Sequence, residues 1–414
     1  MTLSLNRIGG FVSETGAEIL AFDNARSLLY VVSGGTVLQV IDISDPTAPS
    51  EVISFDIDDL GAPVAGANSV AFKNGLLAVA LEAEVQTDPG AVALVNLDAI
   101  SSPDDIESAT KVFVVGSLPD MVTFTPDGSK VLVANEGEPD EGIDPDGSVS
   151  IIDISGEFVS LSQENVATAE GIQPLGLKDF SKGLPQLTNY DFINRGDIAN
   201  GGEALTTATG ETIELGGFSG LYYDGKADNG SLKFLAVPDR GPNGDVDDDN
   251  NRPFLLPDYQ ARVVAFELNE ATGEIEITEE LLLQREDGTP ITGLPTIQNV
   301  DRQSVDAEGN PVDLPELEGF ETFGADYDPF GADLESILRA PDGTLWMVDE
   351  YRPAIYQFDT SGTLLNRFVP DGTAAQATEA NPDNTFDAGT FGSEALPADY
   401  LNRRANRGFE GAAL

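Results

Sequence analysis

Apolar and polar residues alternate along short segments in the first part of the chain, and the pattern returns about every fifty residues. Phe22, Phe72 and Phe124 lie in equivalent apolar segments, 50 and 52 residues apart. Alternation over about four to eight residues is typical of half-buried β-strands, and a repeat period near 50 residues is typical of propeller blades. Residues 17–154 are therefore predicted to form three similar β-sheet blades.

Each of these repeats continues with two further predicted strands. The second strands are expected at residues 28–33, 76–81 and 131–135, and the third strands at residues 37–43, 91–97 and 148–154. Pro-Asp-Gly sequences at 126–128 and 145–147 supply the preset φ of proline and the positive φ that glycine tolerates, which turns between strands need. Helices are expected to be few.

The second half of the chain carries two larger units of the same kind. Their strands are predicted at residues 218–224, 232–237 and 262–268, and then at 334–340, 344–348, 355–358 and 364–369. The stretch between residues 366 and 402 is interpreted as a long loop, of a length that is usually functional or disordered. The predicted fold class is all-β, with about five four-stranded propeller blades and the start of another.

The two sets of repeats are separated by a less periodic stretch that is richer in Gly, Asn and Thr. This stretch reads as a connector with room for an edge strand. The predicted organisation is therefore a propeller region at residues 1–159, a connector at 160–212 and a second propeller region at 213–414.

A short pattern, an apolar residue followed by Ser or Glu and then a small residue, opens three predicted blades. It occurs at residues 217–220, 333–336 and 408–411. Strand alternation turns the Ser or Glu away from its apolar neighbour, so Ser219, Glu335 and Glu410 are expected at equivalent places. The chain ends four residues after Glu410. We therefore expect it to be incomplete at its C-terminus.

Composition restricts the partners and the chemistry. The chain has 72 Asp and Glu against 21 Lys and Arg, a formal charge of −51, and no His or Cys. This charge argues against nucleic acid and anionic membranes and favours cations, which would also screen the self-repulsion in an extracellular or cell-surface setting. The missing residue types exclude a His general base, a Ser-His-Asp triad and thiol catalysis.

No targeting or spanning segment is visible. No apolar run approaches the roughly 18 residues of a membrane-spanning helix. Residues 1–14 lack the charged start and apolar stretch of a secretory signal. We predict no membrane span.

Five carboxylates are expected at one edge of the second propeller region. In an antiparallel blade the first strand starts where the second strand ends. Glu335 and Glu410 open first strands, whereas Asp239, Asp349 and Glu350 follow second strands. Such crowded charges need a cation, and oxygen-only ligands favour calcium. We predict metal ligands at Asp239, Glu335, Asp349 and Glu410, and catalytic residues at Glu335, Asp349, Glu350 and Glu410.

Arginines beside these carboxylates provide a way to hold phosphate. Arg240, supported by Arg352 or Arg403, could grip a phosphate bidentately, while bound cations neutralise its oxygens and position a water. Such a site would hydrolyse phosphate esters without histidine. Two alternatives stay open: carboxylates that cap turns or hold a structural ion, and an ion pair between Arg240 and Asp239.

A second candidate calcium site lies in the loop that carries Asp245, Asp247 and Asp249 in alternation. This spacing can direct several oxygens to one ion. The EF-hand pattern fails, because Asn250 stands where the turn glycine belongs and Leu256 where the bidentate Glu belongs. A solvated acidic loop is the alternative.

Two families are recognisable in these residues. The run 66–97 and the run 116–139, which contains Val-Ala-Asn-Glu-Gly-Glu-Pro, resemble the choice-of-anchor I domain, a propeller-type repeat of bacterial surface and secreted proteins. From residue 215 on, the chain is similar to the esterase-like phytase family at 216–221, 239–241, 333–336, 349–353 and 403–411. It differs from that family's usual form at Pro238, Ser336 and Arg352.

The second resemblance implies a calcium-dependent phosphoric ester hydrolase of the cell surface or exterior, with a phosphorylated small molecule as substrate. Two other functions remain open. A noncatalytic, calcium-stabilised adhesion propeller would use the same carboxylates for a structural ion. A lactonase-like propeller hydrolase would use a single ion held by Glu and Asp.

Overall fold

The structure is a computed structural model of the 414-residue chain. It describes residues 7–13, 16–32, 35–60, 64–100, 102, 105–137, 143, 145–154, 186–192, 205–206, 210, 212–213, 215–242, 252–301, 304–305, 327–403 and 408–412. The chain divides into two compact units. The N-terminal unit comprises Ile8–Ile193 and Gly216–Leu221, and the C-terminal unit comprises Met1–Arg7, Asn194–Leu215 and Tyr222–Leu414.

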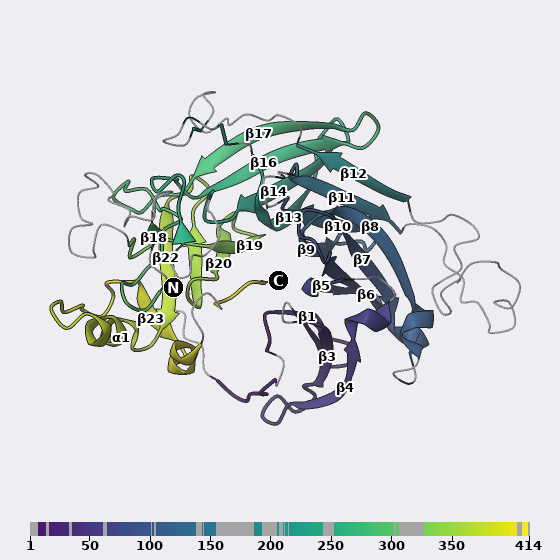
Figure 1. The fold of residues 1–414 in the computed structure, drawn as a ribbon, viewed down its shortest axis with the longest axis horizontal. Coiled ribbons are helices and arrows are strands. Elements are labelled where there is room, and N and C mark those ends of the chain that lie inside the picture. The colour runs from purple at the N-terminus through teal and green to yellow at the C-terminus, as the bar shows by residue number, and fades with distance from the viewer. Residues whose placement is uncertain are drawn as a thin grey trace, which may run out of the picture. The chain divides into compact units, whose positions relative to one another are not determined.

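The described part of the N-terminal unit contains three four-stranded sheets, drawn in purple to blue in Figure 1. They are β1 (Ile19–Asp23), β2 (Leu28–Val32), β3 (Val37–Asp42) and β4 (Ser50–Asp56); β5 (Gly66–Lys73), β6 (Leu76–Glu82), β7 (Pro89–Asn96) and β8 (Thr110–Ser117); and β9 (Pro119–Phe124), β10 (Lys130–Asn135), β11 (Ser148–Asp153) and β12 (Gln186–Asp191). Within each sheet, every strand pairs antiparallel with its neighbour along the chain. Such a meander is the blade of a β-propeller, so the predicted repeat is confirmed.

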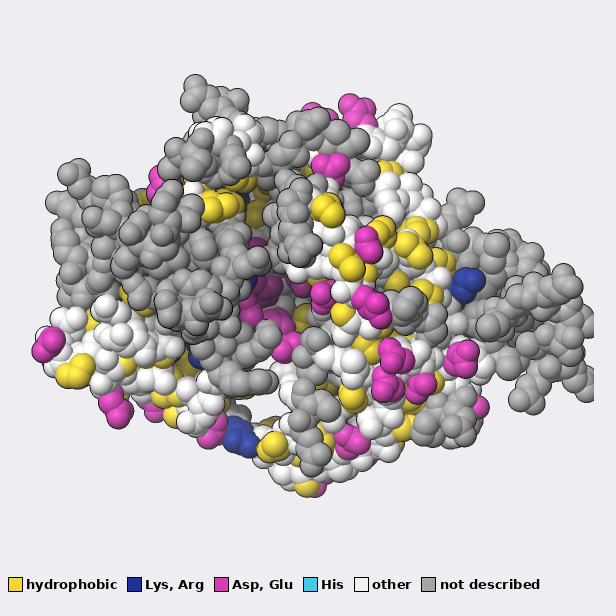
Figure 2. All heavy atoms as spheres, viewed as in Figure 1, with side chains coloured by type: hydrophobic (Ala, Val, Ile, Leu, Met, Phe, Trp, Pro, Cys, Tyr) yellow, Lys and Arg dark blue, Asp and Glu magenta, His cyan; other side chains and the backbone are white. Residues whose placement is uncertain are grey.

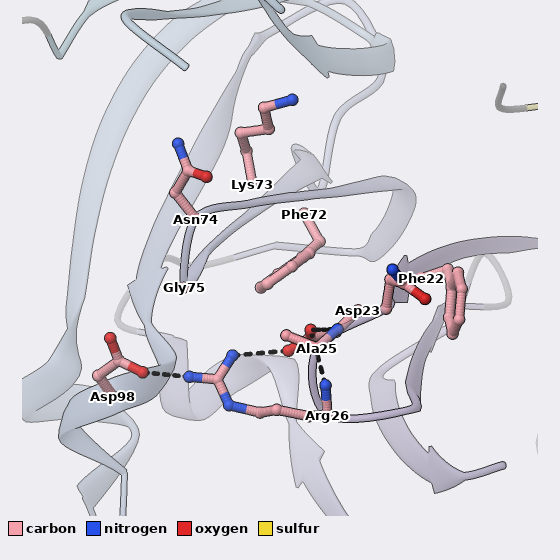
Figure 3. Close-up of a pocket in the computed structure, with 10 residues that line it drawn as sticks. Phe22, Asp23, Ala25, Arg26, Phe72, Lys73, Asn74, Gly75 and Asp98 are labelled. Atoms are coloured by element: carbon pink, nitrogen blue, oxygen red, sulfur yellow. Dashed lines mark hydrogen bonds and ion pairs between the residues drawn. The ribbon is translucent and has the colours of Figure 1, made fainter. Parts of the chain in front are cut away.

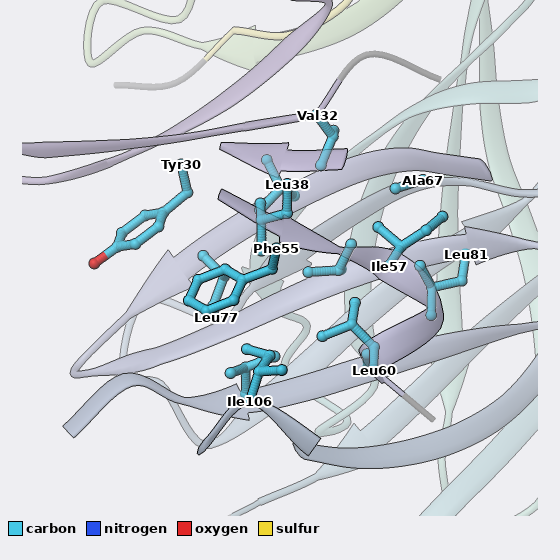
Figure 4. Packing of buried hydrophobic residues seen from close by; sticks show 14 of the residues in the cluster. Tyr30, Val32, Leu38, Phe55, Ile57, Leu60, Ala67, Leu77, Leu81 and Ile106 are labelled. Atoms are coloured by element: carbon cyan, nitrogen blue, oxygen red, sulfur yellow. The ribbon is translucent and has the colours of Figure 1, made fainter. Parts of the chain in front are cut away.

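Strand alternation explains how these sheets form their core. In β1, Ile19, Ala21 and Asp23 are buried, whereas Leu20 and Phe22 face outward and are 53% and 47% exposed. Ile19 and Ala21 join one apolar cluster with residues of the next sheet, and Figure 4 shows this cluster around Tyr30, Leu38 and Leu77. Between the described strands of this unit lie the short 3-10 helices η1 (Ile57–Leu60), η2 (Leu97–Ala99) and η4 (Glu107–Ala109).

The fourth strand of the third sheet comes from the predicted connector. β12 pairs with β11 from Ser148↔Asp191 to Asp153↔Gln186. A strand is thus present in the stretch where an edge strand was expected.

The second half of the chain adds two larger sheets (Figure 1). One consists of β13 (Phe218–Lys226), β14 (Leu232–Pro238), β16 (Arg262–Asn269) and β17 (Glu274–Leu282). The other consists of β19 (Leu334–Arg339), β20 (Leu345–Asp349), β21 (Ala354–Phe358), β22 (Leu364–Pro370) and a parallel edge strand, β23 (Ser393–Leu396). The short strands β15 (Arg252–Pro253) and β18 (Ser304–Val305) pair with each other. The all-β propeller fold class is confirmed.

The interpretation of residues 366–402 as a loop was wrong. After β22 the chain forms the helix α1 (Thr373–Ala380), then β23 and the 3-10 helix η7 (Ala398–Asn402). Four of the eight residues of α1 are alanine, the strongest helix former, and Ala374 and Ala377 pack against Ile297 and Phe391. α1 is the one α-helix among the described residues, in agreement with the expectation of few helices.

An apolar core joins the two larger sheets within the C-terminal unit. Val237 at the end of β14, Ile337 in β19 and Met347 in β20 are among its fully buried residues. On β20, Trp346 stacks on Phe368 with the ring centroids 6.2 Å apart. This core fixes the ends of β14 and β20, which is where the candidate site residues begin.

The molecular surface reflects the composition. On the face shown in Figure 2, Asp and Glu side chains are frequent and Lys and Arg are scarce. Within the described parts of the chain, no helix has the length and apolar character needed to cross a membrane.

Candidate functional site

Pairing between β19 and β20 brings several predicted site residues together. Leu334 pairs with Asp349. The Glu350 N–H donates to the Asp333 carbonyl oxygen at 2.9 Å, and the Asp333 N–H donates to Asp349 Oδ1 at 3.1 Å. The start of the first strand therefore lies beside the end of the second, as the antiparallel pattern predicts.

Three carboxylates converge at this edge. Asp239 follows β14, and Asp333 and Glu335 stand at the start of β19; one oxygen of each lies within 4.8 Å of the others. Asp333 is fully buried, and neither of its carboxylate oxygens accepts a hydrogen bond from the described residues. Among the described residues, this carboxylate cluster, Asp239, Asp333 and Glu335, is the one group of three or more acidic side chains whose oxygens lie close enough together to hold one ion.

Arg240 lies against the carboxylate cluster. Its Nη1 is 2.6 Å from Asp333 Oδ2, and its Nε is 3.2 Å from Asp239 Oδ1. Its Nη2 is 3.9 Å from Glu350 Oε2. The Arg240 side chain is only 11% exposed, so one guanidinium forms ion pairs with several carboxylates at a site that is largely shielded from water.

The pKa values of the two aspartates diverge. Burial, reinforced by Asp239 and Glu335, raises the pKa of Asp333 well above its usual range and outweighs the opposing charge of Arg240. Burial also acts upward on Asp239, but Arg240 and a hydrogen bond from Asp333 outweigh it and lower the pKa of Asp239. The same site therefore moves the pKa values of these two neighbouring carboxyls in opposite directions.

A glycine and a tyrosine hold Arg240 in place. The Tyr351 hydroxyl donates to the Gly293 carbonyl oxygen at 2.6 Å, and the Arg240 guanidinium lies 5.6 Å from the centre of the Tyr351 ring. A Cβ on Gly293 would lie 1.7 Å from the Arg240 carbonyl oxygen. Only glycine permits this close approach.

Asp349 is completely buried and has partners of its own. Its Oδ1 accepts N–H bonds from Asp333 and Tyr351, and its Oδ2 lies 3.3 Å from Nη2 of the buried Arg367. Burial raises the pKa of Asp349 to about 6, against the opposing charge of Arg367. These contacts tie β20 to β22 and to the start of β19.

The other two predicted arginines meet at Asp301 instead. Nη2 of Arg352 lies 3.0 Å from Asp301 Oδ1, and Nη2 of Arg403 lies 3.6 Å from the same oxygen. Arg352 is 1% exposed and also donates to Gln376 Oε1 at 3.2 Å. Burial and the neighbouring Arg352 lower the pKa of Arg403 to about 10. Arg403 also donates to the Tyr351 carbonyl oxygen.

Glu410 belongs to a segment that docks on the same strands. The N–H groups of Gly408 and Phe409 donate to the carbonyl oxygens of Glu350 and Asp349, at 2.7 and 2.9 Å. The Ala412 N–H donates to Ser336 Oγ at 3.2 Å. These bonds lie on either side of Glu410 and place it beside the edge of β19 and β20.

Some predictions concern other parts of the chain, and some site residues were missed. Ser219 is buried in the segment of β13 that belongs to the N-terminal unit, and Asp245, Asp247 and Asp249 lie outside the described residues. Asp333 was not predicted as a ligand, although it stands two residues before Glu335 and strand alternation places both on one side. Asp301 had no sequence signal, because it lies 51 residues from Arg352.

Comparison with known families matches both halves of the chain. Residues 18–173 match the choice-of-anchor I domain, and residues 213–414 match the family described as esterase-like activity of phytase. Residues 18–173, the choice-of-anchor I region, and residues 213–414, the phytase-like region, are thus each similar to a different family. The carboxylate cluster and Arg240 all lie in the phytase-like region.

Matches to individual proteins cover only part of the chain or have low sequence identity. An uncharacterized secreted protein of Arthroderma benhamiae is 30% identical over 154 residues, which cover 34% of this chain and 28% of that protein. Hydrazine synthase of Kuenenia stuttgartiensis has a TM-score of 0.38 at 12% identity, covering 83% of this chain and 64% of that chain. A luciferin-regenerating enzyme has a TM-score of 0.37 at 12% identity, covering 89% and 80%.

The carboxylate cluster of the phytase-like region fits a calcium ion. Calcium binds six to eight oxygens at about 2.3–2.6 Å, so two oxygens on one ion lie no more than about 5 Å apart. The cluster oxygens meet this limit, at 4.8 Å or less. Asp333 is fully buried, and the cation that faces its carboxylate is the guanidinium of Arg240, with Nη1 2.6 Å from Oδ2.

The choice-of-anchor I region has a hollow of about 710 Å³ beside the turns after β1 and β5 (Figure 3). Arg26 crosses it, with Nη1 2.6 Å from Asp23 Oδ2 and Nη2 paired with Asp98. Phe22, Phe72 and Lys73 are among the other residues that line it. Because both carboxylates are occupied by Arg26, this hollow lacks the concentrated charge of the carboxylate cluster.

Proposed function

We propose that the protein is a calcium-dependent phosphoric ester hydrolase that acts at the cell surface or exterior. The observation that carries this proposal is the carboxylate cluster of Asp239, Asp333 and Glu335, with a nearly buried arginine against it, in the region that matches the phytase-like family. Oxygen-only ligands favour calcium, and an arginine fork suits a phosphate group.

The roles follow from the positions of the side chains. Asp239, Asp333 and Glu335 would hold the ion, with Glu410 approaching from the docked C-terminal segment. When bound, calcium would neutralise phosphate oxygens and lower the pKa of an attacking water. Arg240 would bind the phosphate, because its guanidinium lies at the carboxylate cluster, within 3.9 Å of Asp239, Asp333 and Glu350.

Two further residues complete the proposed site. The Glu350 side chain is 12% exposed and lies beside Arg240, which makes it the candidate general base for the attacking water. Asp349 would act by positioning: it receives the N–H groups of Asp333 and Tyr351 and so fixes the backbone on both sides of the site. Arg352 and Arg403 would support the site through Asp301.

An exterior location agrees with three observations. The formal charge of −51 suits a setting with divalent ions or salt. Residues 18–173 match a choice-of-anchor domain, and the Arthroderma relative is described as secreted.

A noncatalytic calcium-stabilised propeller is the second candidate. It is favoured by the ion pairs that Arg240 makes with Asp239 and Asp333, because these pairs give the three residues a structural role that requires no substrate. A lactonase-like hydrolysis would use the same ion but would leave Arg240 without a role in substrate binding.

Phosphate release from phytate and from an aryl phosphate separates these functions. The wild type is expected to turn over with calcium, to lose activity with excess chelator and to regain it with added calcium. Glu335→Gln should abolish turnover, whereas Glu279→Gln on the exposed face of β17 should leave it unchanged. No release of phosphate from either ester, together with a calcium-dependent rise in melting temperature, would contradict the hydrolase and support the structural ion.

A further inference from the structure

We propose that Arg240 is the built-in counter-ion of the carboxylate cluster, and that calcium binds by displacing its guanidinium. This inference rests on the proposed function, because it concerns the same cation site. It adds that a single arginine has two alternative positions, on the carboxylates without calcium and on the substrate phosphate with calcium.

The contacts of Arg240 show why the two cations exclude each other. Its Nη1 lies 2.6 Å from Asp333 Oδ2, which is about the length of a calcium–oxygen bond. Its Nε lies 3.2 Å from Asp239 Oδ1. Calcium bound to the same two carboxylates would face a positive charge at contact distance, and such repulsion is strong in a nearly dry site. The guanidinium must leave for the ion to enter.

The charge balance makes this exchange favourable. Asp239, Asp333 and Glu350 lie within 3.9 Å of Arg240, and Glu335 belongs to the same carboxylate cluster, so one positive charge serves a site with four acidic side chains. Within the described residues, the nearby buried arginines are committed elsewhere: Arg352 and Arg403 to Asp301, and Arg367 to Asp349. A divalent ion would neutralise the carboxylate cluster more completely than Arg240 does.

The backbone at this position is fixed, so only the side chain can move. The Arg240 N–H donates to its neighbour Asp239 at 2.5 Å, and the Arg240 carbonyl oxygen packs against Gly293. A long side chain that leaves the carboxylates from a fixed backbone stays beside them. The released guanidinium of Arg240 therefore stays near the bound ion, where it can bind a phosphate oxygen.

This exchange predicts that calcium and phosphate bind in order. Without calcium, Arg240 is held by carboxylates and cannot grip an anion. With calcium, its guanidinium is free, and the net negative charge that repels phosphate is reduced. Inorganic phosphate should therefore bind more tightly in the presence of calcium, and that gain should depend on Arg240.

Calorimetric titration of calcium into the full chain tests the exchange. We compare the wild type with Arg240→Met, which removes the competing charge, and with Arg240→Lys, which keeps it. Arg339→Met is the matched control, because Arg339 pairs with Asp224 through a 39% exposed side chain. Arg240→Met should bind calcium about tenfold more tightly or better, whereas Arg240→Lys and Arg339→Met should stay near the wild type.

Each outcome has a distinct meaning. Equal or weaker calcium binding by folded Arg240→Met, with folding checked by Trp346 fluorescence, overturns the exchange. No calcium binding by any variant overturns both the exchange and the proposed cation site. Tighter binding by Arg240→Met without turnover of phosphate esters in the wild type supports the exchange and rejects the hydrolase. A titration of inorganic phosphate with and without calcium completes the test. If calcium still increases the phosphate affinity of Arg240→Met, the proposed move of the Arg240 guanidinium onto the phosphate is contradicted.

Discussion

Replacing Asp328 with alanine should destabilise the C-terminal unit and loosen the loop that holds Arg240. Asp328 is fully buried between β18 and β19 in the sequence. Its Oδ2 accepts the N–H and the hydroxyl of Thr292, at 3.0 and 2.9 Å, and its Oδ1 accepts the Phe330 N–H at 2.8 Å. It also pairs with Arg285. Thr292 directly precedes Gly293, which packs on Arg240.

The magnitude follows from the groups that the substitution leaves without partners. Each buried donor that loses its acceptor costs about 1–3 kcal/mol, and removing one partner of a buried ion pair costs about 3–5 kcal/mol in all. These effects overlap, because the same carboxylate serves the donors and Arg285. We expect Asp328→Ala to lower the free energy of unfolding by about 3–5 kcal/mol.

Asp342 offers a control with the same local bonds but without burial. Its Oδ1 accepts the N–H and the hydroxyl of Thr344, at 3.1 and 2.7 Å, in an exposed turn. Water can replace those bonds, so Asp342→Ala should cost less than about 1 kcal/mol. Urea unfolding followed by fluorescence of Trp346, the only tryptophan of the chain, reports on this unit. If the free energies of unfolding of the two variants differ by less than about 1 kcal/mol, burial does not control how much these hydrogen bonds contribute to stability.

Two further predictions concern the same region. Gly293→Ala should shift Arg240 and change the calcium affinity measured by calorimetry, because the added Cβ would lie 1.7 Å from the Arg240 carbonyl oxygen; an unchanged affinity would show that the loop yields without moving the arginine. Burial raises the pKa of Asp349 from 3.8 to about 6, so stability from its protonated form is full below about pH 4 and is lost, by roughly 3 kcal/mol, as the pH rises through 6. Urea unfolding between pH 4 and 7 should show that the free energy of unfolding falls less with rising pH in Asp349→Asn than in the wild type. If it falls equally in both, the pH dependence does not come from Asp349.

The sequence predicted the features that depend on local periodicity. Strand alternation and the spacing of Phe22, Phe72 and Phe124 are properties of neighbouring residues, and they led to the blade pattern that the structure confirms. The same rule placed Asp239 at the end of one strand and Glu335 at the start of another. Applied once more, from Glu335 to the residue two positions earlier, it would also have identified Asp333.

Tertiary structure decided how these charges are shared. Arg240 pairs with Asp333, 93 residues later in the sequence, whereas Arg352 and Arg403 turn to Asp301. No local pattern carries that information, because an ion pair in the interior depends on which strands pack together and on how much water they exclude. The sequence by itself therefore determined the residue types available for chemistry, oxygen ligands and arginines without histidine. Only packing determined that one of those arginines is buried against the carboxylates while the other two serve Asp301.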